Sequence, residues 1–117
     1  MKSFTELHAW QRGMDLVEEI YLITKKFHPD ERFGLTAQIR KAANSVVANT
    51  AEGFGRSTSR DKANKYTIAR GECTEVHAFV LIAIRLKFLP EQEASKAMSL
   101  SIETGKLLSG LIQKYSS

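Results

Sequence analysis

The sequence predicts an all-α protein, an antiparallel up-and-down four-helix bundle formed by one domain over residues 1–117. Apolar residues recur at intervals of three and four, which is the period of an amphipathic helix. Only two prolines and seven glycines interrupt the chain, which favours long helices over many short strands. The strong breaks divide the chain into four segments joined by short connections, the pattern of a bundle with antiparallel neighbours.

The first helix is expected from about Thr5 to Lys26. Ser3 and Glu6 have the spacing of a capping box, although Thr5 could serve as the cap instead. Pro29 disfavours helix at the residue before it and ends the segment. Two neighbouring apolar rows run along this helix. The first row contains Leu7, Trp10, Met14, Val17 and Tyr21, and the second contains Leu16, Ile20, Ile23 and Phe27.

The second helix is expected from about Leu35 to Phe54. Gly53 and Gly55 are expected to end it, because glycine readily adopts a positive φ. Apolar or small residues recur along one side of this segment. They are Leu35, Ile39, Ala42, Ala43, Val46 and Thr50.

The third helix is expected from Ser59, a favourable N-cap, to about Phe88. Pro90 suits the first turn of a fourth helix that continues to the end of the chain. Each segment has an apolar stripe. In the third it is Tyr66, Ala69, Cys73, Val76, Val80, Ala83 and Ile84. In the fourth it is Ala94, Ala97, Met98, Gly105, Leu108, Ile112 and Tyr115.

The third helix carries a second apolar row, roughly opposite the first. This row consists of Ile68, Phe79, Ile82 and Leu86. A lone bundle needs one apolar stripe per helix, and the first and fourth helices also have wide apolar arcs. We therefore expect self-association through this face. The alternative is a wide core stripe with scattered exposed leucines, which are common.

Residues 44–56, NSVVANTAEGFGR, suggest either a phosphate-binding glycine loop or a polar seam beside a helical core. GFGR is only half of a dinucleotide motif and follows a helix, and no Walker loop is present, so no cofactor is predicted. A polar seam beside the core needs hydrogen-bond partners. The predicted seam contains Gln38, Ser45, Asn49 and Glu52, with Arg70 of the next helix.

Within this seam we expect a partly buried ion pair between Glu52 and Arg70, because consecutive helices in a bundle are neighbours. Such a pair sets register more than it stabilises, since burying two charges costs about what their attraction returns. Asn49 and Gln38 would complete the network. A catalytic role for the Glu52 carboxylate is the alternative.

The formal net charge of +4 lies in one short region. Between Gly53 and Gly71 there are five basic residues and one acid, and the rest of the chain is neutral overall. The candidate nucleic-acid contacts in this region are Arg56, Arg60, Lys62 and Lys65. Such a cluster is the electrostatic pattern of a nucleic-acid-binding surface. The alternative is a solvated helix start.

No catalytic or metal site is predicted. Cys73 and His77 are four residues apart, a spacing that suits a metal, but two ligands do not make a site. The single cysteine indicates a reducing compartment, and no apolar run is long enough to span a membrane. We expect a cytoplasmic protein that is not an enzyme and has no contact with membranes.

One set of residues carries a family resemblance. It comprises Pro29, Glu31, Arg32, Gly34-Leu35, Gln38, Arg40, Ala42-Ala43, Ser45-Val46, Asn49, Ala51-Glu52-Gly53, Gly55-Arg56, Ala69-Arg70-Gly71 and Glu75. Together these residues resemble the family of proteins encoded in intervening sequences of bacterial 23S ribosomal RNA. The resemblance covers nearly the whole chain. Val47 and Glu72 stand where a proline and a serine are usual.

The resemblance implies an up-and-down four-helix bundle that forms a ring-like homopentamer and has no enzymatic activity. A related branch, the accessory proteins of diversity-generating retroelements, binds nucleic acid and a reverse transcriptase. We therefore expect an oligomeric scaffold or interaction protein whose partners are itself and another protein. The alternative is an RNA- or DNA-binding module whose basic surface is repeated around a ring.

Overall fold

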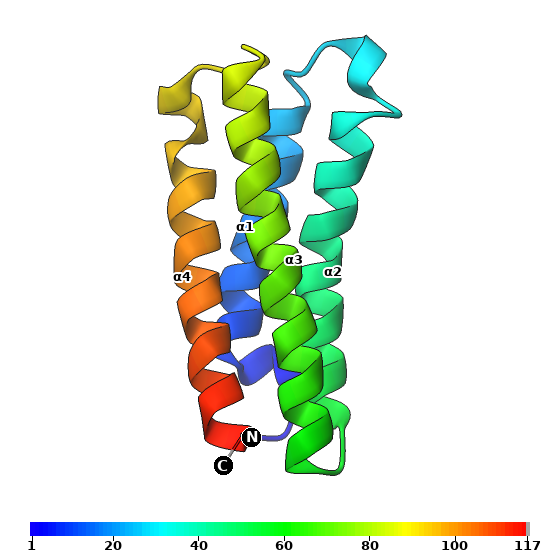
Figure 1. Cartoon of the computed structure of the whole chain (residues 1–117), viewed down its shortest axis with the longest axis vertical. Coiled ribbons are helices and arrows are strands. Elements are labelled where there is room, and N and C mark those ends of the chain that lie inside the picture. Colours follow the sequence, from blue (N-terminus) through cyan, green and yellow to red (C-terminus); the bar gives the residue numbers. More distant parts are fainter. Residues whose placement is uncertain (117) are drawn as a thin grey trace.

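The computed structural model describes residues 1–116, which form four α-helices joined by short connections (Figure 1). The helices are α1 (His8–Thr24), α2 (Leu35–Gly55), α3 (Ser59–Arg85) and α4 (Glu91–Tyr115). Single 3-10 turns, Phe4–Glu6 and Pro29–Glu31, precede α1 and α2. No strand occurs within residues 1–116. The predicted all-α class and four-helix bundle are confirmed.

Successive helices run in opposite directions, and each packs against two others. α2 lies beside α1 and α3, and α4 lies beside α3 and α1, whereas the diagonal pairs bring no Cα atoms within 8 Å of each other over the described part of the chain. The Cα atoms span 43 × 24 × 21 Å. Figure 1 shows the start of the chain, the end of α4 and the α2–α3 connection at one end of the bundle. The basic residues that follow α2 therefore lie at this end.

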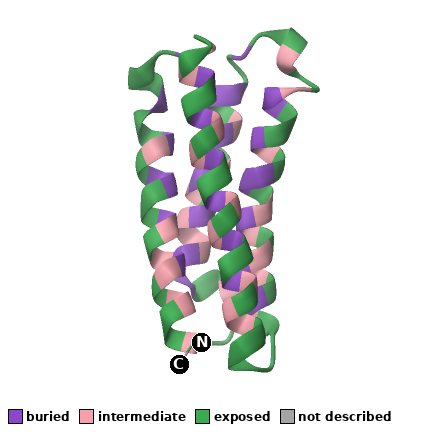
Figure 2. Ribbon diagram, in the orientation of Figure 1, coloured by how far each residue is buried: buried purple, intermediate pink, exposed green. Residues whose placement is uncertain are grey.

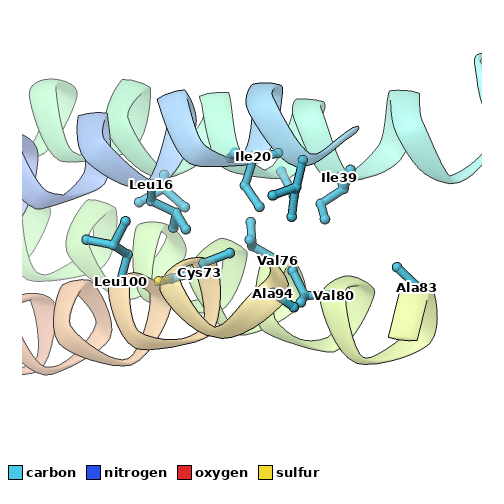
Figure 3. Close-up of a cluster of buried hydrophobic side chains, with 14 of the residues drawn as sticks. Leu16, Ile20, Ile39, Cys73, Val76, Val80, Ala83, Ala94 and Leu100 are labelled. Carbon is cyan, nitrogen blue, oxygen red and sulfur yellow. The ribbon is translucent and has the colours of Figure 1, made fainter. Parts of the chain in front are cut away.

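The core lies along the axis of the bundle, where buried residues line the inward sides of all four helices (Figure 2). Figure 3 shows Leu16 and Ile20 of α1 and Ile39 of α2 opposite Val76 and Val80 of α3. Six of the seven residues predicted for the stripe of α3 are buried, and Ile84 is half-buried. The period of the sequence therefore identifies the inward face of this helix correctly.

The two apolar rows of α1 have different environments. All four residues of the second row, which includes Leu16 and Ile20, are buried in the core. In the first row only Leu7 is buried, and Met14 is 39% exposed. The second row is thus the core face of α1, and the first row lies along its edge.

The start of α1 differs from the prediction. The capping box of Ser3 and Glu6 is present, but it caps the 3-10 turn at Phe4–Glu6. Leu7 then has extended backbone angles, φ −72° and ψ 128°, so α1 begins only at His8. At the other end, bonds from Lys26 N to Ile23 O and from Phe27 N to Thr24 O tighten the last turn. The helix therefore ends at Thr24, before Lys26.

α2 ends without a glycine in the left-handed conformation, contrary to the expectation that Gly53 or Gly55 would adopt a positive φ. No glycine within residues 1–116 has a positive φ. Gly53 is buried inside the helix, which continues to Gly55 and ends because Arg56 is extended, with φ −72° and ψ 149°. The Gly-Phe-Gly stretch is therefore part of a helix.

The end of α3 is a Schellman motif in which a lysine replaces the usual glycine. Lys87 has a φ of 63°. Phe88 N donates to Ala83 O at 2.8 Å, and Lys87 N donates to Ile84 O at 3.0 Å. The helix therefore ends at Arg85, earlier than expected. The predicted N-cap Ser59 is wrong: the N-cap is Thr58, whose Oγ1 accepts from Asp61 N at 3.1 Å, and Ser59 is the first residue of α3.

Candidate functional site

The basic region occupies the α2–α3 connection and the first two turns of α3, at the end of the bundle that carries the start of the chain (Figure 1). Arg56 and Arg60 are exposed, whereas Lys62 and Lys65 are half-buried. The four predicted nucleic-acid contacts therefore have different environments.

Lys62 is bound to the protein itself. Its Nζ donates to Phe54 O at 2.6 Å and to Gly53 O at 3.3 Å. The same Nζ lies 5.6 Å from the ring centroid of Phe54 and 5.8 Å from that of Tyr115. It thus supplies donors to carbonyls in the last turn of α2, where helical i→i−4 partners are missing. Gly53 O also accepts from Arg56 N at 3.3 Å. Lys62 fixes the end of α2 against α3 and α4.

Lys65 forms the closest ion pair of this region, with Glu52 of α2. Its Nζ lies 2.9 Å from Glu52 Oε2, and Arg56 Nη2 lies 3.7 Å from the same oxygen. The hydrogen bond and charge of Lys65 lower the pKa of Glu52, and the charge of Arg56 adds to this effect. Glu52 therefore neutralises part of the basic region.

The predicted ion pair between Glu52 and Arg70 is wrong. Arg70 Nη1 instead donates to Ser109 Oγ of α4 at 3.3 Å. Arg70 is five residues beyond Lys65, which is about 7.5 Å along the helix axis. It also lies on the side of α3 that faces α4. Glu52 therefore pairs with the basic residue at its own height in the bundle.

The remaining members of the polar seam do not form the predicted network. Asn49 Nδ2 donates to Ser45 O at 2.9 Å and to Ser45 Oγ at 3.0 Å, so both contacts remain within α2. Gln38 is exposed, and it shares a groove of about 270 Å³ between α2 and α3 with Ser45 and Glu72. Burial and the nearby Glu75 carboxylate raise the pKa of Glu72.

Cys73 and His77 both contact Ser101 of α4. Cys73 Sγ donates to Ser101 O at 3.1 Å, and His77 Nδ1 lies 3.1 Å from Ser101 Oγ. Burial raises the pKa of the Cys73 thiol to about 11, so the thiol is neutral at physiological pH. Residues 1–116 contain no group of three or more potential metal ligands. Both side chains connect α3 to α4.

Three of the four residues predicted for the oligomer face are exposed. Ile68, Ile82 and Leu86 have exposed fractions of 41%, 42% and 56%. We call these three residues the α3 strip. Phe79 differs, because it is half-buried and packs against the core. Phe79 falls in the predicted second row because the core-facing stripe of α3 is wide enough to include it.

Sequence reasoning missed a polar contact between α1 and α2. Arg40 Nε donates to Thr24 Oγ1 at 2.8 Å, and its guanidinium lies 4.5 Å from the ring centroid of Tyr21. Asn44 Nδ2 donates to the hydroxyl of Tyr21 at 2.9 Å. Arg40 and Asn44 lie outside the apolar row of α2, so the periodicity of that row does not identify them.

The exposed aromatic ring of Phe33 was also missed. This side chain lies in the α1–α2 connection and is 85% exposed, with the Arg32 guanidinium 4.9 Å from its ring centroid. The sequence signal for an exposed ring was an aromatic residue in a connecting segment, outside any periodic apolar row.

No helix within residues 1–116 is long and apolar enough to cross a membrane.

Comparison with known proteins identifies the family. Residues 5–110 match the model of the 23S rRNA-intervening sequence protein family. The fold is also similar to the crystal structure of a protein of unknown function from the S23 ribosomal protein family of Bacteroides thetaiotaomicron VPI-5482, with a TM-score of 0.82 and 23% identity. That alignment covers 90% of this chain and 95% of the other. No curated protein matches the sequence. On the family match, which spans most of the bundle, the chain belongs to the 23S rRNA-intervening sequence protein family.

Proposed function

We propose that the protein is a non-enzymatic, cytoplasmic scaffold that assembles as a homopentamer and presents a repeated surface to a protein partner. The observation that carries this proposal is the α3 strip. Its three aliphatic side chains are between 41% and 56% exposed. Burying such surface against another copy is favourable, at about 25 cal/mol per Å² of apolar area.

A ring requires two different surfaces on each copy, because its contacts are heterologous. α1 lies diagonally across the bundle from α3 and exposes Met14 and Leu22, which are 39% and 49% accessible. The proposal therefore pairs the α3 strip of one copy with this face of α1 on the next copy. The number five rests on the family resemblance.

The experiment compares Ile82→Lys with Leu81→Lys by native mass spectrometry at micromolar concentration. These neighbouring residues of α3 have similar exposures, 42% and 49%. Their side chains point about 100° apart around the helix, so only Ile82 belongs to the strip. Ile82→Lys should dissociate the oligomer while Leu81→Lys leaves it intact. Circular dichroism serves as the control that both variants remain helical. An oligomer that survives Ile82→Lys would contradict the proposed interface.

A second candidate function is nucleic-acid binding through the basic region. The observation that favours it is the exposure of Arg56 and Arg60 at one end of the bundle. The Arg60 side chain makes no hydrogen bond or ion pair with any other residue in the range 1–116. The resemblance to the accessory proteins of diversity-generating retroelements supports the same function. In a ring the two arginines would recur on every copy, and several weak contacts would act together.

Fluorescence anisotropy with a structured RNA and a DNA duplex tests this second candidate at several salt concentrations. Arg56→Glu/Arg60→Glu should weaken binding and flatten its salt dependence, since each lost phosphate contact reduces the slope by about 1. Lys25→Glu/Arg85→Glu makes the same charge change at the opposite end of the bundle and should have less effect. Equal binding by the two double variants would exclude the basic region as the nucleic-acid surface.

A further inference from the structure

A groove of about 540 Å³ lies between α3 and α4. This volume is in the range of about 300–1,000 Å³ that is typical of small-molecule sites. Ser101, Gly105 and Ser109 of α4, spaced four residues apart, line it with little side-chain bulk. A Cβ atom added at Gly105 would meet nothing within 4 Å. The groove is therefore open space, and small residues on α4 keep it open.

The charged side chains that line the groove are both cations. Arg70 contributes from α3, Lys106 contributes from α4, and no aspartate or glutamate takes part. The Cys73 thiol in the lining adds no negative charge, because burial raises its pKa to about 11. In a chain with 13 acidic residues, this local composition gives the groove a positive potential.

Arg70 of α3 and Lys106 of α4 both line the groove. Arg70 Nη1 donates to Ser109 Oγ at 3.3 Å, and Lys106 is three residues before Ser109, about 4.5 Å along α4, so Lys106 and the Ser109 partner of Arg70 are neighbours on the α4 surface. A guanidinium has five N–H donors, and Ser109 is the hydrogen-bond partner found for the Arg70 guanidinium in the described chain. The remaining donors of Arg70 and the ammonium of Lys106 can receive an anion together.

The rest of the groove is more apolar. Ile102 is 48% exposed and stands at its edge, and Cys73 is buried in its wall. His77 lies two helical turns from Arg70, about 10 Å along α3. Its Nδ1 is held by Ser101 Oγ at 3.1 Å. The groove thus combines two cations with a short stretch of apolar surface.

We propose that this groove binds a small organic anion, with its phosphate or carboxylate at Arg70 and Lys106 and its apolar body along Ile102 and Cys73. The site is distinct from the basic region at the α2–α3 connection and from the α3 strip. Binding of a small anion here would be additional to the proposed scaffold function, which does not require a ligand.

The test is a titration of the ¹⁵N-labelled full chain with hexyl phosphate, followed by NMR. Hexyl phosphate should shift amides around residues 70–77 and 101–109. Inorganic phosphate and hexanol, which each lack one half of the ligand, should bind at least about tenfold more weakly. Heptanoate, compared with hexyl phosphate, distinguishes a carboxylate site from a phosphate site. Shifts confined to other residues, or no shift at millimolar hexyl phosphate, would overturn the proposal.

Gly105→Leu provides the decisive variant, because its side chain would fill the groove. Gly110→Leu is the matched control, since a Cβ there also meets nothing within 4 Å and Gly110 does not line the groove. Both changes raise helix propensity, so lost binding would not reflect lost folding. Gly105→Leu should weaken hexyl phosphate binding at least about tenfold, and Gly110→Leu less than about twofold.

Arg70→Gln/Lys106→Gln should also weaken hexyl phosphate binding about tenfold or more while leaving hexanol binding unchanged. Equal affinity of the Gly105→Leu and Gly110→Leu variants would refute the site. A loss of oligomer mass specific to Gly105→Leu would instead identify the groove as a contact between copies, which also overturns the proposal.

Discussion

Gly53 of α2 lies directly against the aromatic ring of Tyr66 of α3. A Cβ atom at Gly53 would be 2.6 Å from Tyr66 Cε1 and 2.8 Å from Tyr66 Cδ1. Tyr66 is 1% exposed, so its ring has little room to move. This contact brings the two helices together just before the basic region. It also sets the height at which Glu52 meets Lys65.

Gly53→Ala should destabilise the protein by about 1–3 kcal/mol, the usual cost of overpacking a closely packed site. Alanine is the better helix former, so a net loss must come from the contact with Tyr66. Gly71→Ala is the control, because a Cβ there meets nothing within 4 Å. It should stabilise the protein by about 0.5–1 kcal/mol. Urea unfolding measures both changes, and equal effects of the two would refute the close approach.

Thr104→Val should stabilise the protein by about 1 kcal/mol. Within residues 1–116, Thr104 Oγ1 is the buried side-chain N or O atom that has no hydrogen-bond partner. Valine has nearly the same shape and removes the unsatisfied hydroxyl. Thr50→Val is the matched control, since Thr50 is equally buried but its Oγ1 donates to Val46 O at 2.7 Å. Thr50→Val should give no gain in thermal unfolding, and an equal gain in both variants would contradict this account.

Stability should fall as the pH rises through the alkaline range. Burial, with the nearby Tyr115 adding to it, raises the pKa of Tyr66 to about 12, and burial raises that of Cys73 to about 11. In the unfolded chain these groups ionise near their ordinary values of 10.0 and 9.0. The unfolded state therefore releases protons first, and the free energy of unfolding decreases between about pH 9 and pH 12.

Tyr66→Phe removes one of these titrations and keeps the ring. The variant should lose less stability than the parent above pH 10, as measured by urea midpoints from pH 8 to pH 11.5. Cys73→Ala should reduce the loss that begins near pH 9. Identical pH profiles for the parent and both variants would show that neither group titrates differently on folding.

Glu52→Gln should strengthen nucleic-acid binding if the basic region is the binding surface. The change releases Lys65 and Arg56 from their contacts at 2.9 and 3.7 Å. The Glu52 carboxylate is exposed to solvent, so its ion pairs contribute little to stability and the melting temperature should change little. Anisotropy titrations at low salt measure the effect. Weaker binding of the variant at unchanged stability would argue against a role for these cations.

The fold was predictable from sequence because its main determinants are local. The spacing of residues such as Val76 and Val80 shows which face of a helix is buried, and Pro29 and Pro90 mark breaks. The ends of α2 and α3 differ from the prediction because lysine and glycine exchange their usual roles. Lys87 adopts the left-handed conformation with a φ of 63°. Gly53 lies within the helix, where the absence of a side chain leaves room for the Tyr66 ring.

The contacts of the candidate site were less predictable because they depend on the height at which neighbouring helices meet. The sequence indicates that α2 and α3 are neighbours, but a shift of five residues decides between Lys65 and Arg70 as the partner of Glu52. The α3–α4 groove has the same origin. It forms where Gly105 of α4 lies opposite the segment of α3 that contains Arg70 and Cys73. The sequence of either helix alone does not indicate that these two segments lie opposite each other.

Native mass spectrometry of the parent protein at micromolar concentration is the most direct test of the proposed assembly. We predict a single dominant species of five copies, each of 13.1 kDa. A monomer that persists across the micromolar range would contradict it, because the α3 strip would then remain in water.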